Sequence, residues 1–405
     1  MKSRLLQGGL VAGVAWLLTF TPLLNHAAAQ SMEVPTKQVL TFLESLQGRQ
    51  ENNILVGQFG YFGDGETPTT ADARLASIEQ ASGKQIAWTG ADYEARSATR
   101  AETNQWLIQQ WQLGRLVMLS WHMPNPFAPE KGSDCRLGDD RCAEDNVQQL
   151  LTPGNAAYDF YQYQLTQVAD DLTVLRDAGV VIIWRPFHEM NGGWFWWHQQ
   201  PKAAFVALWQ QMYTYFTEQR GLNNLLWAYS PNDVWSEWAT PVDYYYPGAD
   251  YVDLVGLDVY YSKDQESLDL DRYAGSYQPL AALNKPMGLF EFGPSPSNGC
   301  CPTQFDYTKL LNDIRTKYPK LAFFQAWEWI YSIPENKGVA ALMNDPAVVD
   351  LADLPKWSTV QVVPAVANTP VAPKGTPFAP VAATPIVIEI KIDIRIEIQQ
   401  VTPQP

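Results

Sequence analysis

Eight short apolar runs recur along the chain, separated by longer stretches in which polar and apolar residues mix. Each run is almost continuously apolar and rich in β-branched or aromatic side chains, which predicts strands that are buried on both faces. The runs are ILVGQFG (54–60), QIAWTGADY (85–93), RLVMLSWH (115–122), VVIIWRPFHE (180–189), NNLLWAYSP (223–231), YVDLVGLDVY (251–260), PMGLFEFG (286–293) and LAFFQAWEW (321–329).

The stretches between the runs can form amphipathic helices. The clearest is 156–178, where one helical face carries Phe160, Leu165, Val168, Leu172 and Leu175. Strands that alternate with helices predict an α/β fold, here a (β/α)8 TIM barrel with long loops at its C-terminal face. A doubly wound open sheet is the alternative. It is less favoured because no glycine-rich phosphate-binding motif follows the first run.

Polar side chains with useful chemistry stand where these predicted strands end. Active sites of TIM barrels are built at the C-terminal ends of the strands, so this distribution supports the barrel. The residues are Asp92, His122, His188, Glu189, Asn232, Asp258, Tyr260, Glu291 and Glu328.

The N-terminus has the pattern of a secretory signal peptide. Lys2 and Arg4 precede an apolar stretch at 10–24, and small residues at 27–29 precede Gln30. We therefore expect a signal peptide at 1–29, cleavage after Ala29, and a secreted, extracellular protein. The apolar stretch is short for a membrane span, so no membrane association is expected after cleavage.

The composition changes after the last apolar run. We expect the barrel domain at 30–358, followed by a Pro-rich linker at 359–385. A short tail at 386–405 alternates isoleucine or valine with charges of both signs, which is typical of a strand with one apolar face. It is too short to fold alone. It can dock on the barrel, pair with another chain or be the remnant of a lost module.

Charge and cysteine content narrow the possible partners. The full chain has a net charge of −15, and without Lys2 and Arg4 it keeps 26 basic against 43 acidic residues. This balance argues against nucleic acid and anionic membranes as partners, and it gives no information on oligomeric state. The four cysteines are expected to form disulfides, with three possible connectivities, and their spacing is unlike a zinc site. They are Cys135, Cys142, Cys300 and Cys301.

The stretch RPFHEMNGGWFWW (185–197) carries the strongest chemical signal. Glu189 follows an apolar strand and is expected to be walled by Trp194, Trp196 and Trp197. Loss of water raises the pKa of a carboxyl group and makes it a general acid near neutral pH. Arg185 points the same way along the strand and can hold a second carboxylate. A purely structural buried Arg–Glu pair is the alternative.

The stretch GLFEFGPS supplies a second carboxylate, Glu291, at the end of the seventh run. Burial of a charged residue after an apolar strand costs free energy, so such a residue is expected to be paired or functional. Glycoside hydrolysis uses two carboxyl groups, and a separation of about 5 Å corresponds to retention of configuration. In that case Glu291 is the nucleophile, and Glu189 is first the acid and then the base.

RPFHEMNGGWFWW resembles the acid/base signature of glycoside hydrolase family 26, whose best-known members are endo-β-1,4-mannanases. The motifs MLSWHMPNP, LVGLDVYY, GLFEFG and FFQAWEW also occur along the chain in the order that this family shows, so the resemblance covers most of 33–356. It implies a (β/α)8 barrel with the acid/base and nucleophile glutamates after the fourth and seventh strands, and retention of configuration.

Matched motif by motif, the resemblance assigns a role to each site residue. Glu189 is similar to the acid/base and Glu291 to the nucleophile, while Arg185 and Tyr260 match the residues that support the nucleophile. The residues implied around the −1 sugar and as aromatic walls are His188, His122, Trp194 and Trp327, with Trp327 as a candidate floor. The sequence departs from the family's pattern at His198, often glycine, and at Glu328, where some mannanases have an arginine that fixes the −2 sugar.

The sequence therefore predicts a secreted retaining endo-β-1,4-mannanase that acts on mannan, galactomannan or glucomannan and uses no metal or cofactor. The same machinery acting on mixed-linkage β-glucan or β-1,3-xylan is an alternative, because the family includes such members. A non-catalytic carbohydrate-binding barrel is a second alternative, since tryptophans alone bind sugar faces. A metal-dependent hydrolase using His122, His188 and His198 is a third, although no zinc-binding histidine pair occurs. Tyr260 and His122 also admit a plain structural role.

Overall fold

The eight predicted strands all form. The computed structural model describes residues 21–47, 51, 53–94, 96–135, 146–260, 267–294 and 304–357, with side chains from residue 32 onward. Each apolar run contains one buried strand, and a two-residue strand, β9, follows near the end of the described chain. The strands are β1 (Ile54–Phe59), β2 (Trp88–Asp92), β3 (Leu116–Trp121), β4 (Ile182–Pro186), β5 (Leu225–Tyr229), β6 (Leu254–Tyr260), β7 (Met287–Gly293), β8 (Leu321–Ala326) and β9 (Val348–Val349).

The strands close into a parallel barrel. Neighbours in sequence pair in the order β2 to β8, and β1 closes the ring by pairing with both β2 and β8. All pairings are parallel, so every strand ends at the same rim. The short β9 adds to β1 outside the ring at Ile54 and Leu55. The predicted (β/α)8 barrel is thus confirmed.

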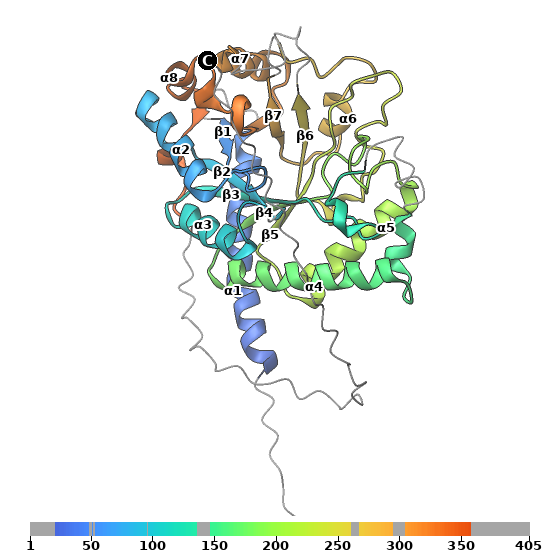
Figure 1. Ribbon diagram of the computed structural model, residues 1–405. Helices are drawn as coiled ribbons and strands as arrows, with labels where there is room; N and C mark the ends of the chain where they lie inside the picture. The colour runs from blue at the N-terminus through green and yellow to red at the C-terminus, as the bar shows by residue number, and fades with distance from the viewer. Residues whose placement is uncertain are drawn as a thin grey trace, which may run out of the picture. The chain divides into compact units, whose positions relative to one another are not determined.

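Helices between the strands form the outer layer of the barrel (Figure 1). The amphipathic helix expected at 156–178 is present as α4, but its buried stripe runs through Tyr161, Leu165, Val168, Leu172 and Leu175, whereas Phe160 is only partly buried. The α-helices are α1 (Thr21–Leu46), α2 (Pro68–Ser82), α3 (Arg100–Gln112), α4 (Ala156–Asp177), α5 (Lys202–Tyr213), α6 (Tyr277–Ala281), α7 (Tyr307–Lys317) and α8 (Val339–Met343).

Aromatic rings facing glycines fill the barrel interior. Trp88 on β2 contacts Phe290 on β7 and Phe323 on β8, two strands that are not neighbours of β2, so the rings meet across the interior. A Cβ atom on Gly288 would lie 2.1 Å from the ring of Phe323, and one on Gly256 would lie 2.6 Å from the ring of Phe290. These glycines therefore leave the space that the aromatic rings occupy.

Helix α1 lies against the N-terminal end of the barrel. Thr36 donates from Oγ1 to the carbonyl oxygen of Asn223, just before β5, at 3.0 Å. Gln47, directly after the helix, donates to the carbonyl oxygen of Lys285, just before β7, at 3.1 Å. These contacts hold the end of the barrel opposite the polar strand ends, which leaves the C-terminal rim for a site.

By its internal contacts the chain divides into residues 1–362 and residues 363–405. The predicted linker and tail, residues 1–20 of the predicted signal peptide and the cysteines at 142, 300 and 301 lie outside the described residues. The domain limits and the disulfide pairing therefore stay predictions. None of the described helices combines the length and apolarity that a membrane span requires.

Candidate active site

The polar strand ends gather around one cleft of about 510 Å³ at the C-terminal rim of the barrel. Seven of the eight residues predicted for the site line this cleft, and the eighth, Arg185, is fully buried beneath it. The lining residues are His122, His188, Glu189, Trp194, Phe195, Asn232, Asp233, Trp235, Tyr260, Arg272, Glu291 and Trp327.

Glu189 lies in a strained turn directly after β4. Its φ is 54° and that of Phe187 is 50°, a left-handed backbone that non-glycine residues rarely adopt. The amide of Glu189 donates to the carbonyl oxygen of Ser230, after β5, at 2.7 Å, which fixes the turn to the neighbouring strand. Burial, reinforced by the charge of Glu291, raises the pKa of the Glu189 carboxyl to about 8. The raised pKa predicted from the sequence is confirmed.

The tryptophans after Glu189 have different surroundings. Trp194 donates from its indole nitrogen to Oε2 of Glu189 at 2.5 Å. Trp196 and Trp197 are buried, and their indole nitrogens donate to the backbone oxygens of Met123 and His188. The expectation that all three wall the carboxyl was therefore wrong in detail, because only Trp194 contacts it and the other two pack in the core below.

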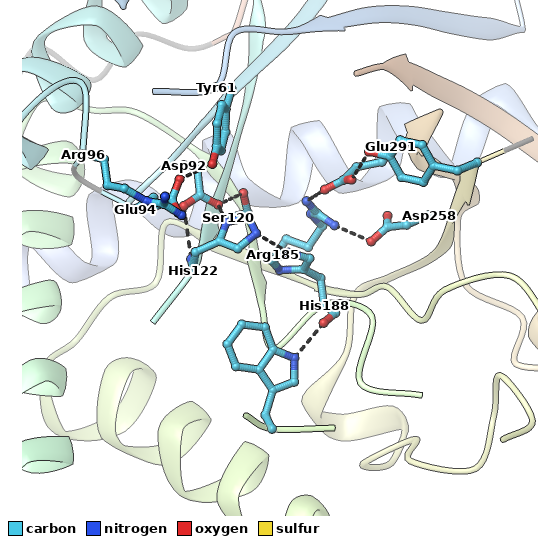
Figure 2. Close-up of polar contacts among 12 residues, drawn as sticks. Tyr61, Asp92, Glu94, Arg96, Ser120, His122, Arg185, His188, Asp258 and Glu291 are labelled. Carbon is cyan, nitrogen blue, oxygen red and sulfur yellow. Dashed lines mark hydrogen bonds and ion pairs between the residues drawn. The ribbon is translucent and has the colours of Figure 1, made fainter. Parts of the chain in front are cut away.

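Glu291, on β7, is held through both carboxylate oxygens (Figure 2). Arg185 donates to Oε1 of Glu291, and it also donates to Oδ2 of Asp258 at 2.7 Å. Tyr260 donates from its hydroxyl group to Oε2 of Glu291 at 2.7 Å. The sequence predicted that Arg185 binds a second carboxylate and that Tyr260 supports Glu291, and both contacts are present.

Three acidic side chains meet at this point. Oxygen atoms of Glu189, Asp258 and Glu291 lie within 4.8 Å of one another. The positive charge among them is the guanidinium of Arg185, which is fully buried and bonded to two of the three. One cation thus compensates Asp258 and Glu291, while Glu189 has no basic partner among the described contacts. This difference favours the protonated form of Glu189.

Two histidines meet on the other side of the cleft. The Nε2 atoms of His122, after β3, and His188, after β4, lie 3.2 Å apart. The Nδ1 atom of His122 lies 2.8 Å from Oδ2 of Asp92. His198 is buried elsewhere, with its Nδ1 against the carbonyl oxygen of Phe195, so the three described histidines do not form one metal-binding group.

Aromatic rings form the apolar part of the cleft. Trp327 stacks on Phe59 at 4.9 Å and contacts Tyr61 at 5.1 Å between ring centres. Trp194 packs against Trp235, a partly exposed residue, at 5.6 Å. Flat apolar rings at a polar cleft match the faces of sugar rings.

Several residues in the cleft wall or beneath it were not assigned from the sequence. Asp92 and Asp258 were noted only as strand ends, and their contacts depend on which strands are neighbours. Asp233 and Arg272 form an ion pair at 2.6 Å in the cleft wall, and no pattern in the sequence marks the loop that carries Arg272.

Glu328, the position at which the sequence departs from some relatives, does not line the cleft. It lies 3.8 Å from Arg74 on α2, which also pairs with Glu66 at 2.9 Å. Burial and the charge of Glu66 raise the pKa of Glu328 to about 8. Glu328 therefore joins the loop after β8 to α2.

Comparison with known proteins gives consistent matches. The sequence profile of glycosyl hydrolase family 26 matches residues 28–353. A mannan endo-1,4-beta-mannosidase of Bacillus subtilis is 33% identical over 348 residues, 81% of this chain and 89% of that protein. The structure of the Bacillus subtilis mannanase man26 has a TM-score of 0.67 at 32% identity, covering 80% of this chain and 94% of that one. Endoglucanase H of Acetivibrio thermocellus is 28% identical over 170 residues, 39% of this chain and 18% of that protein.

Proposed function

The chain belongs to glycosyl hydrolase family 26, and we propose that it is a retaining endo-β-1,4-mannanase in which Glu189 is the acid/base and Glu291 the nucleophile. The observation that carries the proposal is that two glutamates with different surroundings lie close together, since Glu291 is bonded to Arg185 and Tyr260 and Glu189 is not. Their oxygens lie within 4.8 Å, near the separation of retaining enzymes and well below the roughly 6.5–9.5 Å of inverting enzymes.

In the first step Glu189, which keeps its proton below about pH 8, donates that proton to the oxygen of the scissile glycosidic bond. As the bond from this oxygen to C1 breaks, a carboxylate oxygen of Glu291 forms a bond to C1. The sugar chain on the far side leaves as a neutral alcohol, and the near side remains as an ester on Glu291. Arg185 and Tyr260 orient Glu291 for this attack.

In the second step Glu189 is a carboxylate and takes a proton from a water molecule. The oxygen of this water forms a bond to C1, and the ester bond to Glu291 breaks. Glu291 returns as a carboxylate and Glu189 as an acid, so one water is consumed for each bond cleaved. Two inversions at C1 give net retention.

Three features support a neutral β-linked polysaccharide as the substrate. Two relatives that are 33% identical to this chain are mannan endo-1,4-beta-mannosidases of Bacillus subtilis. The cleft is lined by the indoles of Trp194, Trp235 and Trp327, which suit sugar faces. The signal-peptide pattern at 1–29 supports secretion to the outside of the cell, where such polymers are found.

The same machinery acting on a glucan is the second candidate. The match to Endoglucanase H favours it, although that match covers only 39% of this chain. A carbohydrate-binding protein without catalysis is less consistent with Glu189, since a buried carboxyl with a raised pKa lowers stability and serves no purpose in simple binding.

The test is release of reducing ends by the purified mature chain from galactomannan, glucomannan, mixed-linkage β-glucan and β-1,3-xylan in parallel. We expect strong release from the two mannans only. NMR of the first products gives the stereochemistry, and retention is expected. Release from a glucan or xylan alone would mean that the substrate is not a mannan. First products with inverted configuration at C1 would overturn the retaining mechanism. Unchanged activity in Glu291→Ala would overturn the assignment of Glu291 as the nucleophile.

A further inference from the structure

We propose that Asp92 is a positioning residue that keeps His122 protonated, so that a fixed cation other than Arg185 acts on Glu189. This His122 imidazolium donates from Nε2 to a neutral His188 and adjusts the proton affinity of Glu189 between the two steps. The inference rests on the proposed function, since it concerns the acid/base role of Glu189.

Asp92 is fully buried at the end of β2, where it accepts two hydrogen bonds from β3 and the residue after it and forms an ion pair with His122. Ser120, its register partner on β3, donates from its hydroxyl group to Oδ2. The backbone amide of His122 donates to Oδ1 at 3.1 Å, and the ring Nδ1 of His122 lies 2.8 Å from Oδ2 (Figure 2). Among the described contacts of Asp92, the His122 ring is the group that can carry a positive charge.

A buried carboxylate requires a counterion or full hydrogen bonding. Asp92 has both if His122 is protonated. The imidazolium then donates from Nδ1 to Asp92, and it has a second N–H at Nε2. The rings of His122 and His188 meet edge to face with centres 4.5 Å apart and Nε2 atoms 3.2 Å apart, so this second N–H has His188 as its acceptor.

The proton between the two histidines belongs to His122, because only His122 has an acidic partner in contact. Burial lowers the pKa of His122, but the charge and hydrogen bonding of Asp92 outweigh it, and the pKa is raised to about 9. Burial, together with the charges of Arg185 and His122, lowers the pKa of His188 well below its usual value. One imidazolium and one neutral imidazole result.

Other charged groups around the pair do not change this assignment. Glu94 and Glu291 also favour a charged His122, but Glu94 is engaged by Arg96 and Glu291 by Arg185. The titratable groups around the pair are Tyr61 after β1, Asp92 and Glu94 at the end of β2, Arg185 on β4 and Glu291 on β7.

A fixed cation here suits both steps of the reaction. In the free enzyme the charge of Glu291 and burial keep the proton on Glu189, and the His122 charge opposes them. Once Glu291 is esterified, its negative charge is gone while the cation remains. The proton affinity of Glu189 then falls, which favours the carboxylate that must act as base in the second step.

The first test is the protonation state of each imidazole, which does not depend on activity. The chain has four histidines, so ¹⁵N-histidine NMR gives a spectrum that variants at single histidines can assign. At about pH 7.5, above the ordinary histidine pKa of about 6.5, we expect His122 with two protonated ring nitrogens and His188 neutral. In Asp92→Asn the imidazolium signals of His122 should disappear.

Two variants serve as controls. Ser120→Ala removes one donor to Asp92 and leaves its charge, so His122 should stay protonated. Asp313→Asn alters another buried aspartate, on α7, that pairs with Lys317 outside the cleft, and it should leave the imidazoles unchanged. A neutral His122 in the wild-type chain, or a charged one in Asp92→Asn, would overturn the proposal even if all polysaccharide hydrolysis proceeds as expected.

The second test is the pH profile of kcat/KM. Loss of the cation in Asp92→Asn raises the pKa of Glu189, so the alkaline limb should move upward by about half a unit to one unit. The value of kcat should fall by about 3- to 10-fold, because a pKa raised by this amount lowers the fraction of Glu189 that is ionised as the base of the second step, while KM changes less. A uniform loss of activity with an unmoved alkaline limb would show that Asp92 is only structural.

Discussion

At the scale of single residues, Glu189 and Glu291 are the same amino acid in opposite surroundings. Glu291 accepts hydrogen bonds from Arg185 and Tyr260. Glu189 is buried and receives one hydrogen bond, from Trp194. Two carboxyl groups within 4.8 Å can therefore hold different charges at the same pH, which the double displacement requires.

Removal of Glu189 should affect substrates according to their leaving groups. In Glu189→Ala, kcat should fall by about 10²- to 10⁴-fold on mannan, because the leaving oxygen is no longer protonated. An aryl glycoside whose leaving group is a good anion should lose much less in its first step. Pre-steady-state and steady-state kinetics on both substrates measure this, with Glu291→Ala as the control that should be inactive on both. Equal losses on both substrates for Glu189→Ala would assign the acid to another residue.

At the scale of secondary-structure elements, glycines on the strands determine what fills the barrel. TIM barrels are commonly filled by branched aliphatic side chains, whereas here aromatic rings from β2, β7 and β8 meet at glycine positions. Because β7 carries both Gly288 and Glu291, packing in the interior and the position of the nucleophile depend on the same strand.

Gly288→Ala should destabilise the protein without altering any residue of the cleft. The added Cβ would lie 2.1 Å from Phe323, and overpacking of this kind lowers the free energy of unfolding by about 1–3 kcal/mol. Urea denaturation measures the change. The double variant Gly288→Ala/Phe323→Leu should recover part of the loss relative to the sum of the single variants. Purely additive effects would mean that the clash with Phe323 is not the cause.

The loop after β8 contains a second carboxyl with a raised pKa, Glu328. Its folded pKa of about 8 lies above the unfolded value of 4.5, so its stabilising contribution is complete below pH 4.5 and is lost as pH rises from there through about 8. Glu328→Gln should therefore raise the melting temperature by about 2–5 °C above about pH 8 and change it little near pH 4. Thermal unfolding at both pH values measures this. The exposed Glu335→Gln is the control and should have no pH-dependent effect. An equal shift at both pH values would exclude titration of Glu328 as the cause.

At the scale of the whole molecule, barrel closure brings together residues that are far apart in sequence. The cleft combines side chains from the ends of β3, β4, β6, β7 and β8, and Arg185 on β4 reaches Glu291, 106 positions later. The strands and the two glutamates were predictable because strands buried on both faces give nearly continuous apolar runs, and a carboxyl after such a run stands out.

Other features were not predictable because they depend on contacts between elements. The partnership of Asp92 with His122 requires the register of β2 and β3. The positions of Trp196 and Trp197 depend on the conformation of the loop after β4. The pattern of apolar and polar residues does not determine that conformation. The one-position error at Phe160 arose because a helical stripe read from apolarity alone omitted Tyr161, an amphipathic side chain that is fully buried.

The activity of the whole enzyme should fall as pH rises through about 8. Above this value Glu189 loses the proton needed in the first step. The pH dependence of kcat/KM on a soluble mannan measures the alkaline limb. Trp194→Phe keeps an aromatic platform but removes the hydrogen bond to Glu189, so the limb should move upward. A limb that stays in place would assign the titration to another group.

The backbone of the turn after β4 has a consequence for attempts to improve this protein by selection. Phe187 and Glu189 both adopt a left-handed conformation that glycine would tolerate at lower energy. Exchange of Glu189 for glycine would relieve strain and remove a buried carboxyl in one step. A mutant library screened only for proteins that stay folded on heating is therefore expected to enrich inactive sequences at this position. Each round of such a screen must also select for catalytic activity.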